Sequence, residues 1–290
     1  MFALAHQVLS GLAIGSVYAC VALAIVMIYQ ATRLVNFAQG EMAMFSTYLA
    51  WAMINAGIPY WVAFFLTLVL SFVLGAAIER LIIRRFDGAP VLTVVIVFVG
   101  LLVVINSLAG WLFTYSVKSF DSPFPDSARF GAGYMSPHEM GAIGVTLAML
   151  ALIYVFFRFT PLGLAMRAVA QNPVSARLVG ISVGRMLAIG WGLAAAVGAV
   201  AGMMAAPIIY LDPNMMSGVL LYGFAAALLG GIDNPWGAVI GGFLVGVLEN
   251  IAGAYLVGSE IKLSVAMAII IGVLVAKPSG LFGRVIVTRV

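Results

Sequence analysis

Long apolar runs dominate this sequence and constrain its fold more than any other feature. The first run, residues 4–29, exceeds the roughly 20 residues that an α-helix needs to cross the hydrocarbon core of a bilayer. Only 8% of the residues are charged and the mean hydropathy is +1.17, whereas charged residues make up roughly a quarter of a soluble domain. The sequence therefore predicts an all-α polytopic membrane protein.

The apolar runs predict about eight or nine transmembrane helices in one membrane domain covering residues 1–290. Pairs of glycines with GxxxG spacing, such as Gly11 with Gly15 and Gly198 with Gly202, favour close contact between helices, although a glycine-rich chain also produces such pairs by chance. The expected spans are residues 4–29, 42–54, 61–78, 91–112, 140–157, 186–206, 218–231, 236–257 and 261–276.

Basic residues gather in a few short loops, and they set the expected orientation. Lys and Arg concentrate in residues 80–85, 158–185 and 277–289, and the positive-inside rule places these segments in the cytoplasm. Nine crossings satisfy all three segments with an external N-terminus and a cytoplasmic C-terminus. The polar loop at 113–137 then lies outside. We read the net charge of +4 as this orientation signal and not as a nucleic-acid interface.

The same orientation makes residues 4–112 and 186–276 two halves that run in opposite directions, with the span at 140–157 as connector. Inverted repeats of this kind are common in transporters. The sequence support is short: Leu-Ala-Ile-Gly occurs at 12–15 and again at 187–190, and Gly75 precedes Glu79 much as Gly246 precedes Glu249. Chance alone also produces matches of this length.

The segment at 158–185 interrupts the apolar sequence with four arginines and no acidic residue. Within it, Asn172 followed by Pro173 is a helix-start signal, because an Asn side chain caps free N–H groups and Pro fits the first helical position. Gly180 is a natural helix stop. These residues predict a helix at 173–179, too short to span a bilayer, which we interpret as a docking element.

The predicted short helix presents residues suited to a partner protein. Val174 and Leu178 lie four apart and share one face, and we expect Ala176 to leave room for close approach by a partner. Arg177 can pair with a carboxylate on that partner. The alternative is an amphipathic helix that rests on lipid headgroups.

Polar residues inside the apolar runs are the candidates for a translocation pathway, because ionisable groups at membrane depth are costly. Glu249 is the clearest case, acting in the pathway or gate, or tying two helices together. Asn36 is expected to cap the span at 42–54, with or without a contact to substrate. The remaining candidates are Phe37, Gly40, Thr93, Asn106 and Asn250.

Sequence patterns of enzymes are weak in this chain. Residues 180–184 match the GxSxG pattern of serine hydrolases, but we expect no strand before Ser182, and His6 and His138 are assigned to the opposite membrane face. No GxxxxGK[ST] phosphate loop occurs, so the chain is not expected to bind ATP. The single cysteine, Cys20, excludes a disulfide within the chain and a cysteine metal cluster.

Several motifs resemble, in order and over nearly the whole chain, the LivH-type permeases of branched-chain amino-acid ABC importers. They are RLVNFAQGE at 33–41, GAAIER at 75–80, the segment at 160–184, and LGGIDNPWGA at 229–238 followed by Glu249. The resemblance implies a bacterial inner-membrane permease that passes hydrophobic amino acids inward and is not itself an enzyme.

The same resemblance implies partner chains. These are a second related permease, two ATP-binding subunits that carry ATP and Mg, and a periplasmic substrate-binding protein; no cofactor is expected on this chain. It also implies that residues 170–180 are the coupling segment, with the candidate residues Arg167, Ala170, Asn172, Pro173, Val174, Ala176, Arg177, Leu178 and Gly180.

Two residues depart from the family pattern and leave the substrate open. Gln39 stands where the family often has His, and Gln171 stands where an acid is common. Relatives of similar sequence are associated with amides, urea or aromatic acids, which remain alternatives. A proton-coupled secondary transporter that uses Glu249 is the alternative from a different functional class.

Overall fold

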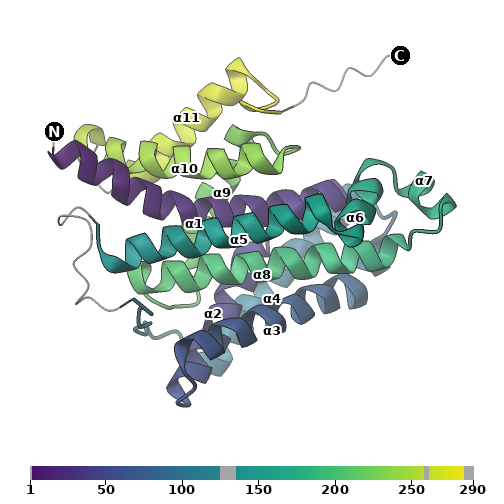
Figure 1. Ribbon diagram of the computed structural model, residues 1–290, viewed down its shortest axis with the longest axis horizontal. Helices are drawn as coiled ribbons and strands as arrows, with labels where there is room; N and C mark the ends of the chain where they lie inside the picture. Colours follow the sequence, from purple (N-terminus) through teal and green to yellow (C-terminus); the bar gives the residue numbers. More distant parts are fainter. Residues whose placement is uncertain (1, 125–134, 258–260, 284–290) are drawn as a thin grey trace.

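The computed structural model describes residues 2–124, 135–257 and 261–283, and in these ranges the protein is built of helices without a strand (Figure 1). One isolated bridge joins Lys118 to Leu211. The helices are α1 (Phe2–Thr32), α2 (Gln39–Asn55), α3 (Tyr60–Leu81), η1 (Ile83–Phe86), α4 (Val91–Phe113), α5 (Pro137–Phe159), α6 (Pro161–Gln171), α7 (Pro173–Leu178), α8 (Val183–Ile209), α9 (Met216–Gly230), α10 (Pro235–Ala252), η2 (Gly253–Val257) and α11 (Lys262–Ala276).

Each predicted span corresponds to one helix in the described ranges, so the expectation of an all-α polytopic membrane protein is confirmed. Six stretches of the described chain are long and apolar enough to cross a membrane, and they contain α1, α3, α4, α5, α8 and α10. The helices α2, α9 and α11 are shorter, with 17, 15 and 15 residues.

Polar caps followed by proline fix where several helices begin. Ser136 accepts a hydrogen bond from the Glu139 N–H, and Glu139 bonds back to the Ser136 N–H, which forms a capping box ahead of α5. Thr160 and Asn234 cap α6 and α10 in the same positions. Each of these helices has proline in its first turn, where no N–H partner is needed.

The long helix α1 packs antiparallel to α10 along the predicted glycine face. A Cβ atom on Gly11 would lie 2.8 Å from the Val247 Cα, and one on Gly15 would lie 3.0 Å from the Gly242 carbonyl oxygen. Gly246 meets the backbone of Gly15 in turn. Small residues on both helices thus let the two backbones touch, as the GxxxG spacing predicted.

The second long helix, α8, packs in the equivalent way against α3. A Cβ atom on Gly75 would lie 2.6 Å from both the Trp191 carbonyl oxygen and the Ala195 Cβ. In addition, α1 contacts α9, and in the equivalent contact α8 packs against α2. Likewise α2 contacts α4, and in the equivalent contact α9 packs against α11. These pairings relate α1–α4 to α8–α11, and α5 connects the two sets.

The two sets run in opposite directions. Ser10 bonds Glu139 and Cys20 contacts Thr146, so α5 is parallel to α1. His138 at the start of α5 bonds the Met204 carbonyl near the end of α8, so α8 runs the other way. Within the structure, α1 and α8 therefore run in opposite directions. The long helices are exchanged, because α8 packs with α2 and α3 and α1 packs with α9 and α10.

Candidate functional site

The helix α2 begins inside the bundle and not at its surface. Gln39, its first residue, donates a hydrogen bond of 3.1 Å from Nε2 to the carbonyl of Ala194, which lies near the middle of the 27-residue α8. Asn36, Gln39 and Glu41 are only 0%, 1% and 5% exposed. The span expected at 42–54 therefore begins earlier, at Gln39, and it begins inside the bundle because the chain re-enters before the helix starts.

The helix α9 starts beside α2 after a similar re-entry from the other end of the bundle. Arg33 and Tyr210, which follow α1 and α8, both have left-handed backbone angles, with φ of 58° and 64°. A Cβ atom on Gly40 would lie 3.2 Å from the Leu220 Cβ and 3.4 Å from the Met216 carbonyl oxygen. The first turns of the two short helices therefore meet within the protein.

A polar cluster lies next to this meeting point, and we call Glu41, Asn106 and Asn214 the central polar cluster; Glu41 is buried, Asn106 is half-buried and Asn214 is exposed. The Asn106 amide donates to Glu41 Oε2 at 3.2 Å, to the Pro213 carbonyl at 2.8 Å and to Asn214 Oδ1 at 3.3 Å. One amide thus joins α2, α4 and the segment that precedes α9. The carboxylate sits in the first turn of α2, where the positive end of the helix dipole favours a negative charge.

The predicted pathway residues divide into those near the cluster and those elsewhere. Phe37 lies against Phe224 of α9, with ring centroids 5.6 Å apart. Asn36 is close by but does not cap α2 as expected: the N-cap position is Ala38, and Asn36 Oδ1 accepts from the Ala38 N–H at 3.0 Å. Thr93 lies in the first turn of α4, is partly exposed and shares none of the cluster's hydrogen bonds.

Glu249 and Asn250 tie α10 to α1. The Tyr18 hydroxyl donates to Glu249 Oε2 at 2.7 Å, and the ring of Tyr18 stacks on Tyr222 with centroids 4.8 Å apart. The Asn250 amide donates to the Gln7 carbonyl at 2.7 Å and to the Gln7 side-chain oxygen at 2.8 Å. Of the two roles considered for Glu249, this geometry supports the tie between helices.

The short helix of the basic segment forms as its sequence predicts. Asn172 Oδ1 accepts from the Ser175 N–H at 3.0 Å, α7 runs from Pro173 to Leu178, and Gly180 follows with φ of 86°. Val174 and Leu178 are 66% and 83% exposed. The described part of the chain leaves this apolar face uncovered.

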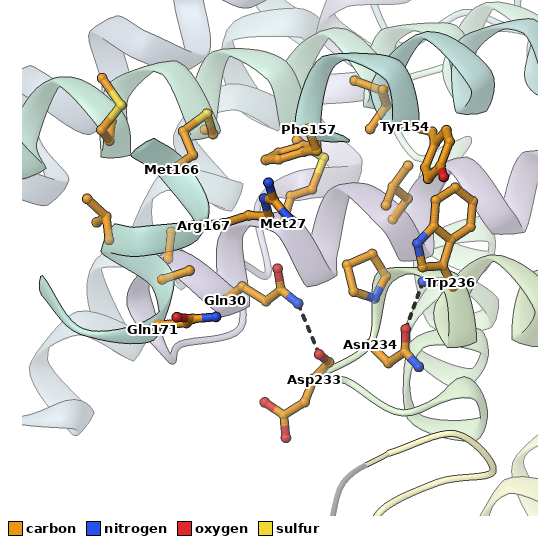
Figure 2. Close-up of a pocket in the computed structure, with 18 of the residues that line it drawn as sticks. Met27, Gln30, Tyr154, Phe157, Met166, Arg167, Gln171, Asp233, Asn234 and Trp236 are labelled. Carbon is orange, nitrogen blue, oxygen red and sulfur yellow. Dashed lines mark hydrogen bonds between the residues drawn. The ribbon is translucent and has the colours of Figure 1, made fainter. Parts of the chain in front are cut away.

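Ala176 does not face outward, which corrects its predicted role. It is only 3% exposed and packs with Val169, Val183 and Met186 in a small cluster between α6, α7 and α8. The close approach that Ala176 permits is therefore to its own chain. Arg167 and Ala170, which were also predicted for the coupling segment, line a cavity of about 670 Å³ next to α6 (Figure 2).

An arginine bridge that the sequence did not indicate holds the base of α8. Arg84 in η1 pairs with Glu79 and also donates to the Gly184 carbonyl at 2.6 Å. Glu79 is 2% exposed. The first half of the chain is thereby fastened to the end of the basic segment. The sequence showed Arg84 and Arg85 as basic residues of a loop, but it gave no sign that Arg84 would bond Gly184.

The serine of the GxSxG pattern has no catalytic surroundings. Ser182 precedes α8 directly, and the residue before it belongs to the turn after α7, not to a strand. His138 bonds the Met204 carbonyl and the Ser122 hydroxyl. Met204 lies at the other end of α8 from Ser182, and Ser122 lies in the loop after α4. The described residues also contain no group of three His, Cys, Asp or Glu side chains that could hold a metal ion.

Comparison with known proteins gives a consistent set of matches. The family described as "Branched-chain amino acid transport system / permease component" matches residues 7–274. The high-affinity branched-chain amino acid transport system permease protein LivH of Escherichia coli K12 is 31% identical, covering 98% of this chain and 97% of that protein. BraD of Pseudomonas aeruginosa, described as the same kind of permease, is 29% identical over the same shares.

A more distant relative comes from an archaeon. A probable branched-chain amino acid transport permease protein LivH of Methanocaldococcus jannaschii is 26% identical, covering 81% of this chain and 76% of that protein. The family match over residues 7–274 includes the re-entrant stretch before α2, the basic segment and α10, so it extends over the elements that build the site.

Proposed function

The chain belongs to the family of branched-chain amino acid transport system permease components, and from this we propose that it is the membrane subunit of an ATP-driven importer for branched-chain or other hydrophobic amino acids. It is a multi-pass permease of the ABC transporter class. The proposed partners are a second related permease, two ATP-binding subunits carrying ATP and Mg, and a substrate-binding protein outside the inner membrane.

The meeting point of α2 and α9 is the proposed translocation region. Discontinuous helices whose first turns meet inside a bundle are a common way to place polar groups on a transport path. Gln39 Oε1 is buried here and has no hydrogen-bond partner among the described residues, so it is available as an acceptor. Glu41, in the same first turn of α2, and Asn106 add a carboxylate and an amide on the side that faces α4.

The uncovered face of α7 is the observation that carries the ATP-driven mechanism. Leu178 is 83% exposed and Val179 is 75% exposed beside the exposed Arg177, at the end of the bundle where Arg84 of η1 bonds the Gly184 carbonyl. An apolar pair next to a cation suits a partner surface that carries an acid. We propose that the ATP-binding subunit covers α7 and that this end is cytoplasmic.

Leu178→Asp and Arg177→Glu test the coupling role in the complex reconstituted with its ATP-binding subunits. Both changes point away from the chain's own core, so the permease is expected to insert normally while substrate-stimulated ATP hydrolysis falls at least ten-fold. Arg85→Glu, also exposed at this end but in η1, is the matched control and should retain coupling. Wild-type coupling in both α7 variants would exclude α7 as the docking helix.

Uptake into proteoliposomes separates the proposed function from its rivals. ATP-dependent leucine uptake that persists with a protonophore supports the importer, whereas uptake that collapses with the proton gradient supports the secondary transporter. Competition by amides, urea or aromatic acids against labelled leucine then ranks the substrate classes. Strong competition by any of these with weak competition by valine and isoleucine would contradict the proposed substrate.

A further inference from the structure

The cavity beside α6 lies between membrane helices, is partly open to the outside and has an apolar inner wall. Its volume is about 670 Å³, and it lies between α1, α5, α6, α8 and α10 (Figure 2). The apolar part of its wall includes Leu23 and Met27 of α1, Leu150, Ile153 and Phe157 of α5, and Val239 of α10. A wall of this kind favours an apolar occupant, because a polar segment would lose its hydrogen bonds to water there.

The rim of the same cavity is basic. Arg33, Arg158 and Arg167 line it, against the single acid Asp233. Asp233 is already paired with Arg33 at 2.8 Å. Among the described residues no carboxylate lies within ion-pair distance of Arg158 or Arg167, so two positive charges face the cavity without a balancing acid. Figure 2 shows the Arg167 side chain reaching in beside Met27 and Phe157.

Aromatic side chains mark the level of the mouth. Trp236 and Tyr154 are 49% and 42% exposed, and their rings meet edge to face with centroids 5.1 Å apart. Exposed Trp and Tyr of this kind favour the headgroup level of a bilayer. The cavity thus opens where lipid phosphates lie, with its apolar wall on the side of the acyl chains.

We propose that this cavity is a binding site for an anionic phospholipid. The phosphate binds Arg158 and Arg167, and the first part of an acyl chain lies along Met27 and Ile153. Basic pockets between transmembrane helices bind anionic headgroups in this manner. Because α5, α6 and α10 all contribute to the wall, the lipid would join the basic segment to the α1–α10 pair.

The test measures lipid retention by the delipidated full-length permease, in the absence of ATP-binding subunits. The protein is mixed with phosphatidylglycerol or phosphatidylcholine in detergent, and the bound lipid is counted by native mass spectrometry. Wild-type protein should retain phosphatidylglycerol in preference to phosphatidylcholine. Arg158→Gln with Arg167→Gln should weaken that binding roughly thirty-fold, since each surface arginine contributes about 1 kcal/mol toward an anionic lipid.

Three controls make the outcome decisive. Arg158→Lys with Arg167→Lys keeps the charge and should keep most of the binding, while Arg80→Gln, exposed but outside the cavity, should change nothing. Equal retention of the two lipids by the wild type, or equal loss in Arg80→Gln, would overturn the proposal. Displacement of the lipid by millimolar inorganic phosphate would overturn it too, because the site would then be one for a free anion.

Discussion

Glu41 is the residue whose replacement should affect the centre of the protein most. It is 5% exposed and accepts a hydrogen bond from Asn106. Glu41→Leu removes that acceptor and places an alkyl group in a polar site, at a cost of about 1 to 3 kcal/mol. We expect a lower thermal midpoint and loss of uptake, measured on purified protein and in proteoliposomes.

Glu41→Gln is the matched change, because it preserves the shape and an acceptor oxygen. It should retain most of the thermal stability and lose less uptake than the leucine variant. Full uptake by Glu41→Leu would show that the central polar cluster is not part of the translocation region.

Glu249 and Tyr18 should behave as one unit. If their hydrogen bond ties α10 to α1, Tyr18→Phe and Glu249→Gln are non-additive, with a coupling energy of about 0.5 to 3 kcal/mol in a double-mutant cycle. The measurement is the thermal midpoint of the two single variants and the double variant. Additive effects together with uptake that falls only in Glu249→Gln would instead assign Glu249 to the pathway.

Local signals at single residues were predictable and long-range ones were not. Asn172 and Gly180 were identified as helix boundaries because capping and left-handed backbone depend on the residues themselves. The direction of Ala176 and the hydrogen bond of Asn36 depend on which elements pack nearby. Sequence alone does not contain that placement, so both expectations were wrong.

Glycine faces allow the long helices to pack closely against their neighbours. Gly246→Leu would push a branched side chain into the backbone of α1 at Gly15, so we expect little folded permease in the membrane. Gly100→Leu is the matched control, because Gly100 is exposed on α4 and nothing lies within 4 Å of its missing Cβ. Detergent-extracted monodisperse protein, measured by fluorescence size-exclusion chromatography, reports the difference. Equal yields from the two variants would contradict the close α1–α10 contact.

Hydrophobic runs predicted where helices exist but not how deep they begin. The spans at 42–54 and 218–231 correspond to α2 and α9 in sequence, yet both helices start inside the bundle. A run of apolar residues indicates removal from water, and the same residues suit the middle of the protein and the lipid. The hydrogen bond from Gln39 to Ala194 shows the depth at which α2 begins.

The orientation of the whole protein is testable with two isosteric cysteines. Ser116→Cys, in the loop after α4, and Ser175→Cys, in α7, replace exposed serines at opposite ends of the bundle (Figure 1). Cys20 is fully buried, so we expect no reaction with an impermeant maleimide. In intact cells only the cysteine at 116 should label, and after membrane disruption both should. Labelling at 175 in intact cells would reverse the proposed orientation.

The exchange of α1 and α8 has a consequence for how the chain is made. Synthesis proceeds from the N-terminus, so α1 is inserted long before α8, α9 and α10, the helices that it contacts most, exist. α3 must likewise wait for α8, since Trp191 and Ala195 cover Gly75. Neither half can complete its core from its own residues, and a ribosome that stalls after α5 leaves both long-helix contacts open.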